Sequence, residues 1–242
     1  MNKIEIFETL WMLIPGHRFK NILRIKFYKI FNKMIITPKT TVKKGATVLL
    51  VGIHVAQTVE TWLDAVGVNG RVIVVEASKE SYDKVKKEII EIKKYDNAIF
   101  ENIAAWNKEG TKTIEIGDRP GSTKVKNIQA HYTKEDLAEN NIYYTNEIQI
   151  KSDKLDNILR NRGINKVEHI QLNINGSEIE AIEGLDNTIK LYKPSFSIKS
   201  ETYLGDNKIP ASEVVIKALE MKNYHVICRK YMPQSPDLTI AV

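Results

Sequence analysis

The sequence has few of the residues that build disulfide frameworks or metal sites. Its single cysteine, Cys228, excludes a disulfide framework and a cysteine-rich zinc site. The histidines His17, His131, His169 and His225 are scattered along the chain, so we expect no metal site.

Long apolar runs are also missing. No stretch approaches the roughly 20 apolar residues that span a bilayer. The first residues carry Glu5 and Glu8 and lack a small-residue cleavage site, so they do not resemble a signal peptide. We therefore expect a cytoplasmic protein.

Acidic residues are nearly absent from the beginning of the chain. Residues 1–45 contain ten Lys and Arg and two Glu, a balance of +8, whereas the remaining chain contains 26 basic and 28 acidic residues, a balance of −2. Such a local excess of positive charge indicates a surface for an anionic partner.

The apolar spacing within this basic segment predicts a helix over residues 18–34. Three interpretations stay open: a cap packed on the main domain, a peripheral helix on an anionic membrane at the inner face, or a grip on nucleic acid phosphates. Aromatic residues lie on the apolar stripe and not among the basic residues, which argues against a nucleic acid partner. We expect residues 1–43 to form an N-terminal basic helical segment, followed by one domain over residues 44–242.

In that domain, apolar strands alternate with amphipathic helices, which predicts an α/β fold with a mostly parallel sheet and helices on both faces. We predict strands over 46–51, 71–76, 98–102, 111–116, 169–174, 195–199, 224–228 and 238–242, and helices over 54–66, 79–94, 153–161, 178–191 and 211–221.

Candidate site residues follow the carboxyl ends of four strands, where open α/β sheets bind ligands. Gly52 and His54 follow the first strand; the glycine allows a close backbone approach to a ligand. Glu76 ends the second strand, 24 residues after Gly52, where a carboxylate can accept both hydroxyls of a ribose or can simply be solvated. Asn102 and Ala104 follow the third strand, with small residues that leave room for an adenine ring. Asn173 follows the fourth, and Glu178 opens the next helix as a site residue or a helix cap.

Several of these segments resemble the FkbM-type methyltransferase family. The run IQLNINGSEIEAIEGL is similar to the family segment K-I-D-V-E-G-A-E-x-x-V-L-x-G, and VLLVGIHVAQT is similar to the family loop D-V-G-A-N-I-G-x-x-T. FENIAAWNKEG is similar to N-x-A-V-x-x-x-x-G, and a Gly121-Ser122-Thr123 turn follows it. The similarity covers about residue 44 to the C-terminus.

The resemblance implies a Rossmann-like class I methyltransferase fold, with a seven-stranded sheet and an antiparallel C-terminal edge hairpin. It implies S-adenosylmethionine as cofactor, bound by Gly52, His54, Glu76, Asn102, Ala104 and Asn173. His54, Asn173 and Glu178 are the implied catalytic residues. The implied reaction is O-methylation of a glycan, glycolipid or small-metabolite hydroxyl.

Departures from the family pattern leave a second hypothesis open. Leu50, Asn173 and Asn175 stand where the family has acids, and the cofactor is a sulfonium cation with an amino-acid head. Loss of these carboxylates should weaken its binding, and an amide is a poor proton acceptor. The alternative is a methyltransferase-like protein that has lost catalysis and serves as a binding or scaffolding module. The retained Gly52 and Glu76 favour the enzyme.

Overall fold

The structure, a computed structural model, describes residues 42–118, 121–126, 130–131, 144–200, 203–204, 209–230 and 237–241. The helix expected over residues 18–34 lies outside these ranges, and the boundary after residue 43 stays a prediction. Among the described helices, none is long and apolar enough to cross a membrane.

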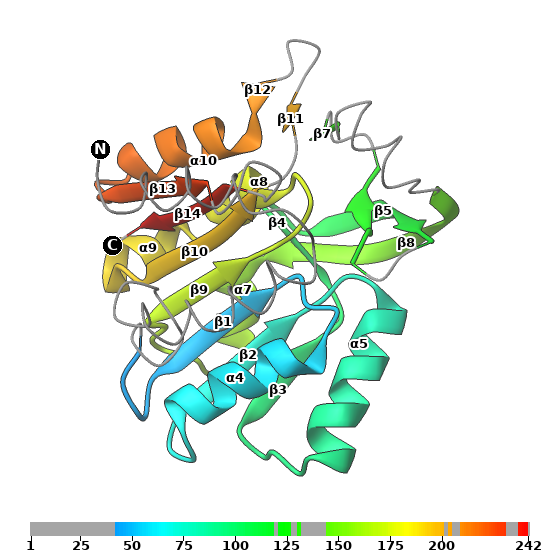
Figure 1. Cartoon of the computed structure of the whole chain (residues 1–242), viewed down its shortest axis with the longest axis vertical. Helices are drawn as coiled ribbons and strands as arrows, with labels where there is room; N and C mark the ends of the chain where they lie inside the picture. The colour runs from blue at the N-terminus through cyan, green and yellow to red at the C-terminus, as the bar shows by residue number, and fades with distance from the viewer. Residues whose placement is uncertain are drawn as a thin grey trace, which may run out of the picture. The chain divides into compact units, whose positions relative to one another are not determined.

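A seven-stranded, mostly parallel sheet forms the centre of the α/β domain (Figure 1). Its order is β13-β14-β10-β9-β1-β2-β3. Strand β14 pairs antiparallel with both β10 and β13, so the last two strands form the expected antiparallel hairpin. The strands span Thr47–Val51 (β1), Arg71–Val75 (β2), Ala98–Glu101 (β3), His169–Leu172 (β9), Ser195–Ser200 (β10), Val226–Lys230 (β13) and Asp237–Ala241 (β14).

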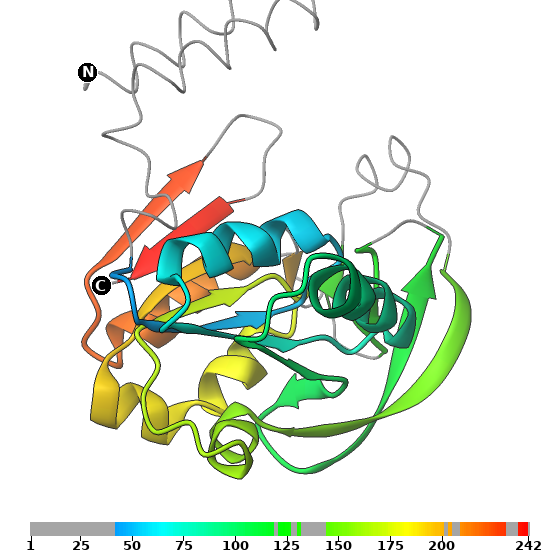
Figure 2. The ribbon, with the colours of Figure 1, turned by 90° about the horizontal axis from the view of Figure 1, so that it is seen from below.

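Helices cover both faces of this sheet, as the two views together show (Figure 2). Val48 and Leu50 of β1 pack in a core with residues of α4 and α5, whereas Leu49 and Val51 pack in a second core with residues of α7 to α10. Both faces of β1 are therefore apolar, which explains its uninterrupted hydrophobic sequence. The helices span Ala56–Val66 (α4), Lys79–Lys86 (α5), Leu155–Asn161 (α7), Glu178–Glu183 (α8), Asp186–Tyr192 (α9) and Ala211–Glu220 (α10), and a π-helical turn over Lys87–Ile92 continues α5.

A second, four-stranded sheet of order β4-β8-β5-β6 lies at the carboxyl ends of the main sheet's strands (Figure 1). Its strands span Ala104–Trp106 (β4), Gly110–Gly117 (β5), Lys124–Val125 (β6) and Tyr144–Lys154 (β8). Trp106, Ile114 and Val125 form its small core. Only the strand over 111–116 was expected here. A third small sheet joins β12 (Ile209–Pro210), β11 (Tyr203–Leu204) and β7 (Ala130–His131).

The helix predicted over 178–191 is interrupted, which corrects the sequence-based expectation. At Gly184, a Cβ atom would lie 2.3 Å from the carbonyl oxygen of Trp106, so this close approach requires glycine. The Asp156 carboxylate accepts hydrogen bonds from the backbone N–H groups of Asn187 and Thr188, at 2.8 and 3.0 Å. The first turn of α9 is thus capped by a residue of α7.

Candidate functional site

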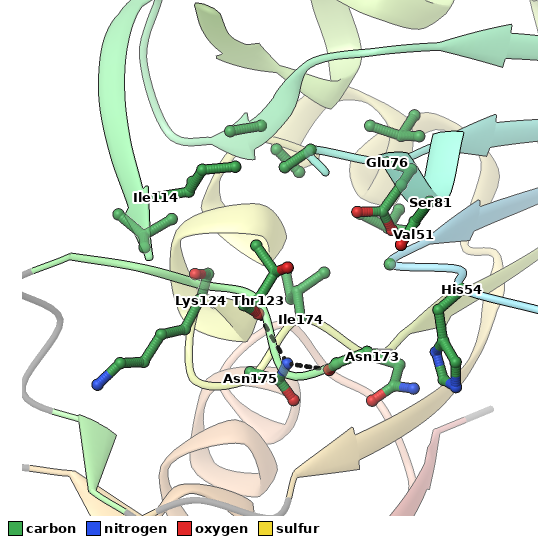
Figure 3. Close-up of a pocket in the computed structure, with 18 of the residues that line it drawn as sticks. Val51, His54, Glu76, Ser81, Ile114, Thr123, Lys124, Asn173, Ile174 and Asn175 are labelled. Atoms are coloured by element: carbon green, nitrogen blue, oxygen red, sulfur yellow. Dashed lines mark hydrogen bonds between the residues drawn. The ribbon is translucent and has the colours of Figure 1, made fainter. Parts of the chain in front are cut away.

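A cavity open to solvent lies at the carboxyl ends of β1, β2 and β9 (Figure 3). The four-stranded sheet supplies the wall opposite these strand ends, through residues of β4, β5 and β6. The lining residues are Val51, Gly52, His54, Val75, Glu76, Ala77, Ser81, Ile103, Ala104, Ala105, Ile114, Gly121, Thr123, Lys124, Val125, Asn173, Ile174, Asn175 and Ser177. Five of the residues singled out in the sequence line this one cavity: Gly52, His54, Glu76, Ala104 and Asn173.

Gly52 brings the loop after β1 against the loop after β9. It has φ of +81°, and a Cβ atom there would lie only 2.0 Å from the Asn173 carbonyl oxygen. Its N–H donates to the carbonyl of Val75 at 2.9 Å, which ties the same loop to β2. No other residue fits this position without moving the backbone.

Glu76 is buried, with 8% of its surface exposed, so the alternative of a solvated strand-end acid is wrong. Its carboxylate accepts hydrogen bonds from the N–H groups of Ile53 at 2.8 Å and Ser78 at 2.7 Å, one on each oxygen. Burial raises the pKa of Glu76 to about 7, although backbone hydrogen bonds act in the opposite direction. The backbone N–H of Ala77 acts on the same carboxylate. A carboxylate has about four lone-pair sites, so acceptor capacity remains for a ligand that donates.

His54 and Asn173 line the cavity together with Glu76, and Figure 3 draws both of them below Glu76. The His54 ring is held against the loop before β6: a Cβ atom on Gly121 would lie 2.8 Å from Nδ1 of His54. This contact requires glycine at position 121, and its φ of +85° requires it as well. The small-residue turn noticed in the sequence is therefore a packing surface for the imidazole.

Asn175 fastens the loop after β9 to the loop before β6. Its side-chain nitrogen donates to the carbonyl oxygens of Gly121 and Thr123, both at 2.8 Å (Figure 3). A carboxylate has no hydrogen to donate to these carbonyls, so the amide at this position has a structural reason. Leu50, in contrast, is fully buried in the core beside α4 and lies away from the cavity. The expectation that it marks a missing site acid is corrected.

Two of the predicted site residues, Glu178 and Asn102, are not among the residues that line the cavity but form hydrogen bonds with the loops that do. Glu178 is 1% exposed, and its carboxylate accepts from the N–H groups of Ile174 at 3.2 Å and Gly176 at 3.0 Å. Burial also raises the pKa of Glu178 to about 7. The Asn102 amide donates to the carbonyls of Glu76 and Ala77, at 2.8 and 3.1 Å. Both residues hold loops in place, which corrects their expected roles in direct contact with ligand.

The sequence did not reveal the residues that the four-stranded sheet and the loop after β9 add to the cavity wall. Among them is Lys124, which lies 3.3 Å from a Glu115 carboxylate oxygen and 4.6 Å from the centre of the Tyr144 ring. Among the described lining residues, Glu76 has the only carboxylate. Ser177 was also missed, although it lies inside the recognised sequence segment.

The methyltransferase FkbM domain matches residues 51–226 of this chain. No match was found among curated proteins. A methyltransferase FkbM from Methylobacillus flagellatus superposes with a TM-score of 0.53 at 12% identity, covering 98% of this chain and 58% of that one. The chain thus spans less than two thirds of the length of that protein.

Fibrillarin from Aeropyrum pernix, whose crystal structure contains natively bound S-adenosyl-L-methionine, superposes with a TM-score of 0.51 at 11% identity. That match covers 88% of this chain and 72% of fibrillarin. At such low identity, these two likenesses show a shared Rossmann-like fold.

Proposed function

This chain belongs to the FkbM methyltransferase family, and from that premise we propose that it transfers a methyl group from S-adenosylmethionine to a hydroxyl oxygen of its acceptor. The observation that carries the proposal is the buried carboxylate of Glu76 beside the Gly52 loop, on the wall of the cavity. One oxygen of Glu76 is already oriented by Ile53, from the loop that Gly52 begins, and the other by Ser78.

The residues present suit the proposed cofactor. A ribose offers two adjacent hydroxyl donors, and the Glu76 carboxylate keeps acceptor capacity beyond its backbone hydrogen bonds. Ile103 and Ala104 line the cavity next to Glu76 and provide an apolar surface for an adenine ring. The glycine at position 52 lets the loop after β1 lie directly against the backbone of Asn173, so both loops contribute to the same wall of the cavity.

Bound S-adenosylmethionine supplies an electrophilic methyl group on a positively charged sulfur. The protein positions the acceptor for in-line displacement, which is a large part of what an enzyme contributes to such a step. We assign His54 to take the proton that the acceptor hydroxyl loses, because it lines the cavity and a neutral imidazole has a ring nitrogen that can accept a proton. Asn173, next to His54 on the cavity wall, orients the acceptor through its amide.

For the acceptor, we propose a hydroxyl of a glycan, glycolipid or small metabolite. The support is the family pattern carried by the sequence. A panel of such hydroxyl compounds, incubated with protein and S-adenosylmethionine labelled in the methyl group, tests this part. Label in the acceptor, lost in His54→Ala, supports the assignment.

One observation favours the alternative, a binding module without turnover. Glu76 has the only carboxylate among the described residues that line the cavity, so the cationic cofactor would find little opposite charge near its sulfur. Calorimetric titration of the full chain with S-adenosylmethionine and S-adenosylhomocysteine separates the cases when it is combined with the label assay. Binding with transfer supports the enzyme; binding without transfer to any acceptor supports the module; no binding contradicts the enzyme.

A further inference from the structure

Ser177 is a residue of the cavity wall, and the fold leaves its buried hydroxyl unpaired. Its side chain is 3% exposed and lines the cavity, and its Oγ has no hydrogen-bond partner among the residues that the structure describes. An unpaired buried hydroxyl destabilises the folded state, so such groups are rare and call for an explanation. A bound ligand supplies the missing partner.

The loop that carries Ser177 is held from two sides. Glu178 accepts hydrogen bonds from the N–H groups of Ile174 and Gly176, and Asn175 donates to the carbonyls of Gly121 and Thr123. These contacts fix the backbone on both sides of the hydroxyl. The backbone of Ser177 is therefore held in one position before a ligand binds. Such preorganisation lowers the entropic cost of binding.

The position of Ser177 along the cavity indicates which part of a ligand it meets. The sheet order places β3, β2, β1 and β9 side by side, and their carboxyl ends carry Ala104, Glu76, Gly52 and Ser177 in that order. S-adenosylmethionine has three parts in a row: adenine, ribose and amino acid. With the ribose at Glu76 and the adenine toward Ala104, the amino-acid end lies toward β9.

We propose that the Ser177 hydroxyl forms a hydrogen bond with the amino-acid end of the cofactor. A hydroxyl suits that end because it can donate to the α-carboxylate or accept from the α-ammonium group. The described lining residues have no carboxylate on this side of the cavity, so no charged partner competes for the ammonium group. The family pattern has alanine at this position, which makes the contact a property of this chain. The inference rests on the proposed function.

The test compares Ser177→Ala with a matched control, Ser152→Ala, in the full chain. Ser152 of β8 is 1% exposed, and its Oγ likewise lacks a partner in the described part of the chain, but it does not line the cavity. Both variants remove a hydroxyl that is unpaired in the free protein, so we expect neither to lower the melting temperature without ligand. Only Ser177→Ala should weaken binding of S-adenosylhomocysteine, by about tenfold, as for loss of a hydrogen bond to a charged group.

Adenosine, which lacks the amino acid, serves as the second probe. We expect Ser177→Ala to bind adenosine as tightly as the wild type, within twofold, and Ser177→Cys to show the same selective loss for S-adenosylhomocysteine. Unchanged binding of S-adenosylhomocysteine, an equal loss for adenosine, or a lowered melting temperature of ligand-free Ser177→Ala overturns the inference alone. If the wild type binds neither S-adenosylmethionine nor S-adenosylhomocysteine, both the proposed function and this inference are overturned.

Discussion

The charge of Glu76 can be removed in two independent ways, by acid and by the substitution Glu76→Gln. Burial raises its pKa to about 7 in the free protein. Ribose hydroxyls donate to the carboxylate and therefore favour its ionised form. As the pH falls below 7, a growing share of the protein must lose a proton from Glu76 before it can bind, so affinity falls.

The size of both effects follows from this arrangement. At pH 6, only about one in eleven Glu76 side chains is ionised, so affinity for S-adenosylhomocysteine should be about tenfold below its plateau above pH 8. Glu76→Gln removes charged hydrogen bonds worth about 1.5–3 kcal/mol, which predicts a loss of about 10- to 150-fold at pH 8. The variant should also show little dependence on pH.

Glutamine also meets the N–H groups of Ile53 and Ser78, and it can accept from only one of them. We therefore expect Glu76→Gln to lower the free energy of unfolding by about 1–3 kcal/mol, and its fold must be checked by thermal unfolding. The assay is calorimetric titration at pH 6, 7 and 8. Burial also raises the pKa of Glu178 to about 7, so Glu178→Gln is the control and should retain the pH dependence. Wild-type affinity that is flat across this range, or folded Glu76→Gln within twofold of wild type at pH 8, refutes the reasoning.

Three further predictions concern the amides and the basic segment. Asn173→Asp should tighten binding of S-adenosylmethionine about tenfold by calorimetry, a modest share of the ~4 kcal/mol that opposite charges 4 Å apart gain at an effective dielectric of about 20; weaker binding would show a site remodelled around the amide. Asn175→Asp, although it restores the family acid, should lower the free energy of unfolding by about 1–3 kcal/mol in denaturant titration, because it faces two carbonyls with no hydrogen to donate; unchanged stability would contradict the fastening role. We propose that residues 18–34 bind anionic membranes: co-sedimentation with phosphatidylserine vesicles should fade with added salt and disappear on deletion of residues 1–36, whereas equal binding to neutral vesicles would contradict the electrostatic argument.

The central sheet could be predicted because its strands are buried on both faces. Val48 to Val51 and Val72 to Val75 are each at most 1% exposed, and a strand buried this way is continuously apolar in sequence. The positions of Gly52, His54, Glu76 and Asn173 followed, since parallel strands end at one edge of a sheet.

Most of the second sheet was not predicted. Its longest strand, Tyr144–Lys154, faces solvent over most of its length, and only Ser152 of it is buried. The alternation Glu147-Ile148-Gln149-Ile150-Lys151 is a strand signal that the predicted elements left out. The role of Asn175 depends on long-range contacts with Gly121 and Thr123, which neither spacing nor residue type reveals. Glu178 instead makes local hydrogen bonds within its own loop, to Ile174 and Gly176. The orphaned hydroxyl of Ser177 can be recognised only from three-dimensional packing.

Calorimetric titration of the full wild-type chain at pH 8 tests the central claim most directly, that this cavity binds S-adenosylmethionine. The account predicts saturable one-to-one binding of both S-adenosylmethionine and S-adenosylhomocysteine, and competition between the two for one site. Absence of heat from both ligands, with protein shown to be folded by circular dichroism, would contradict it.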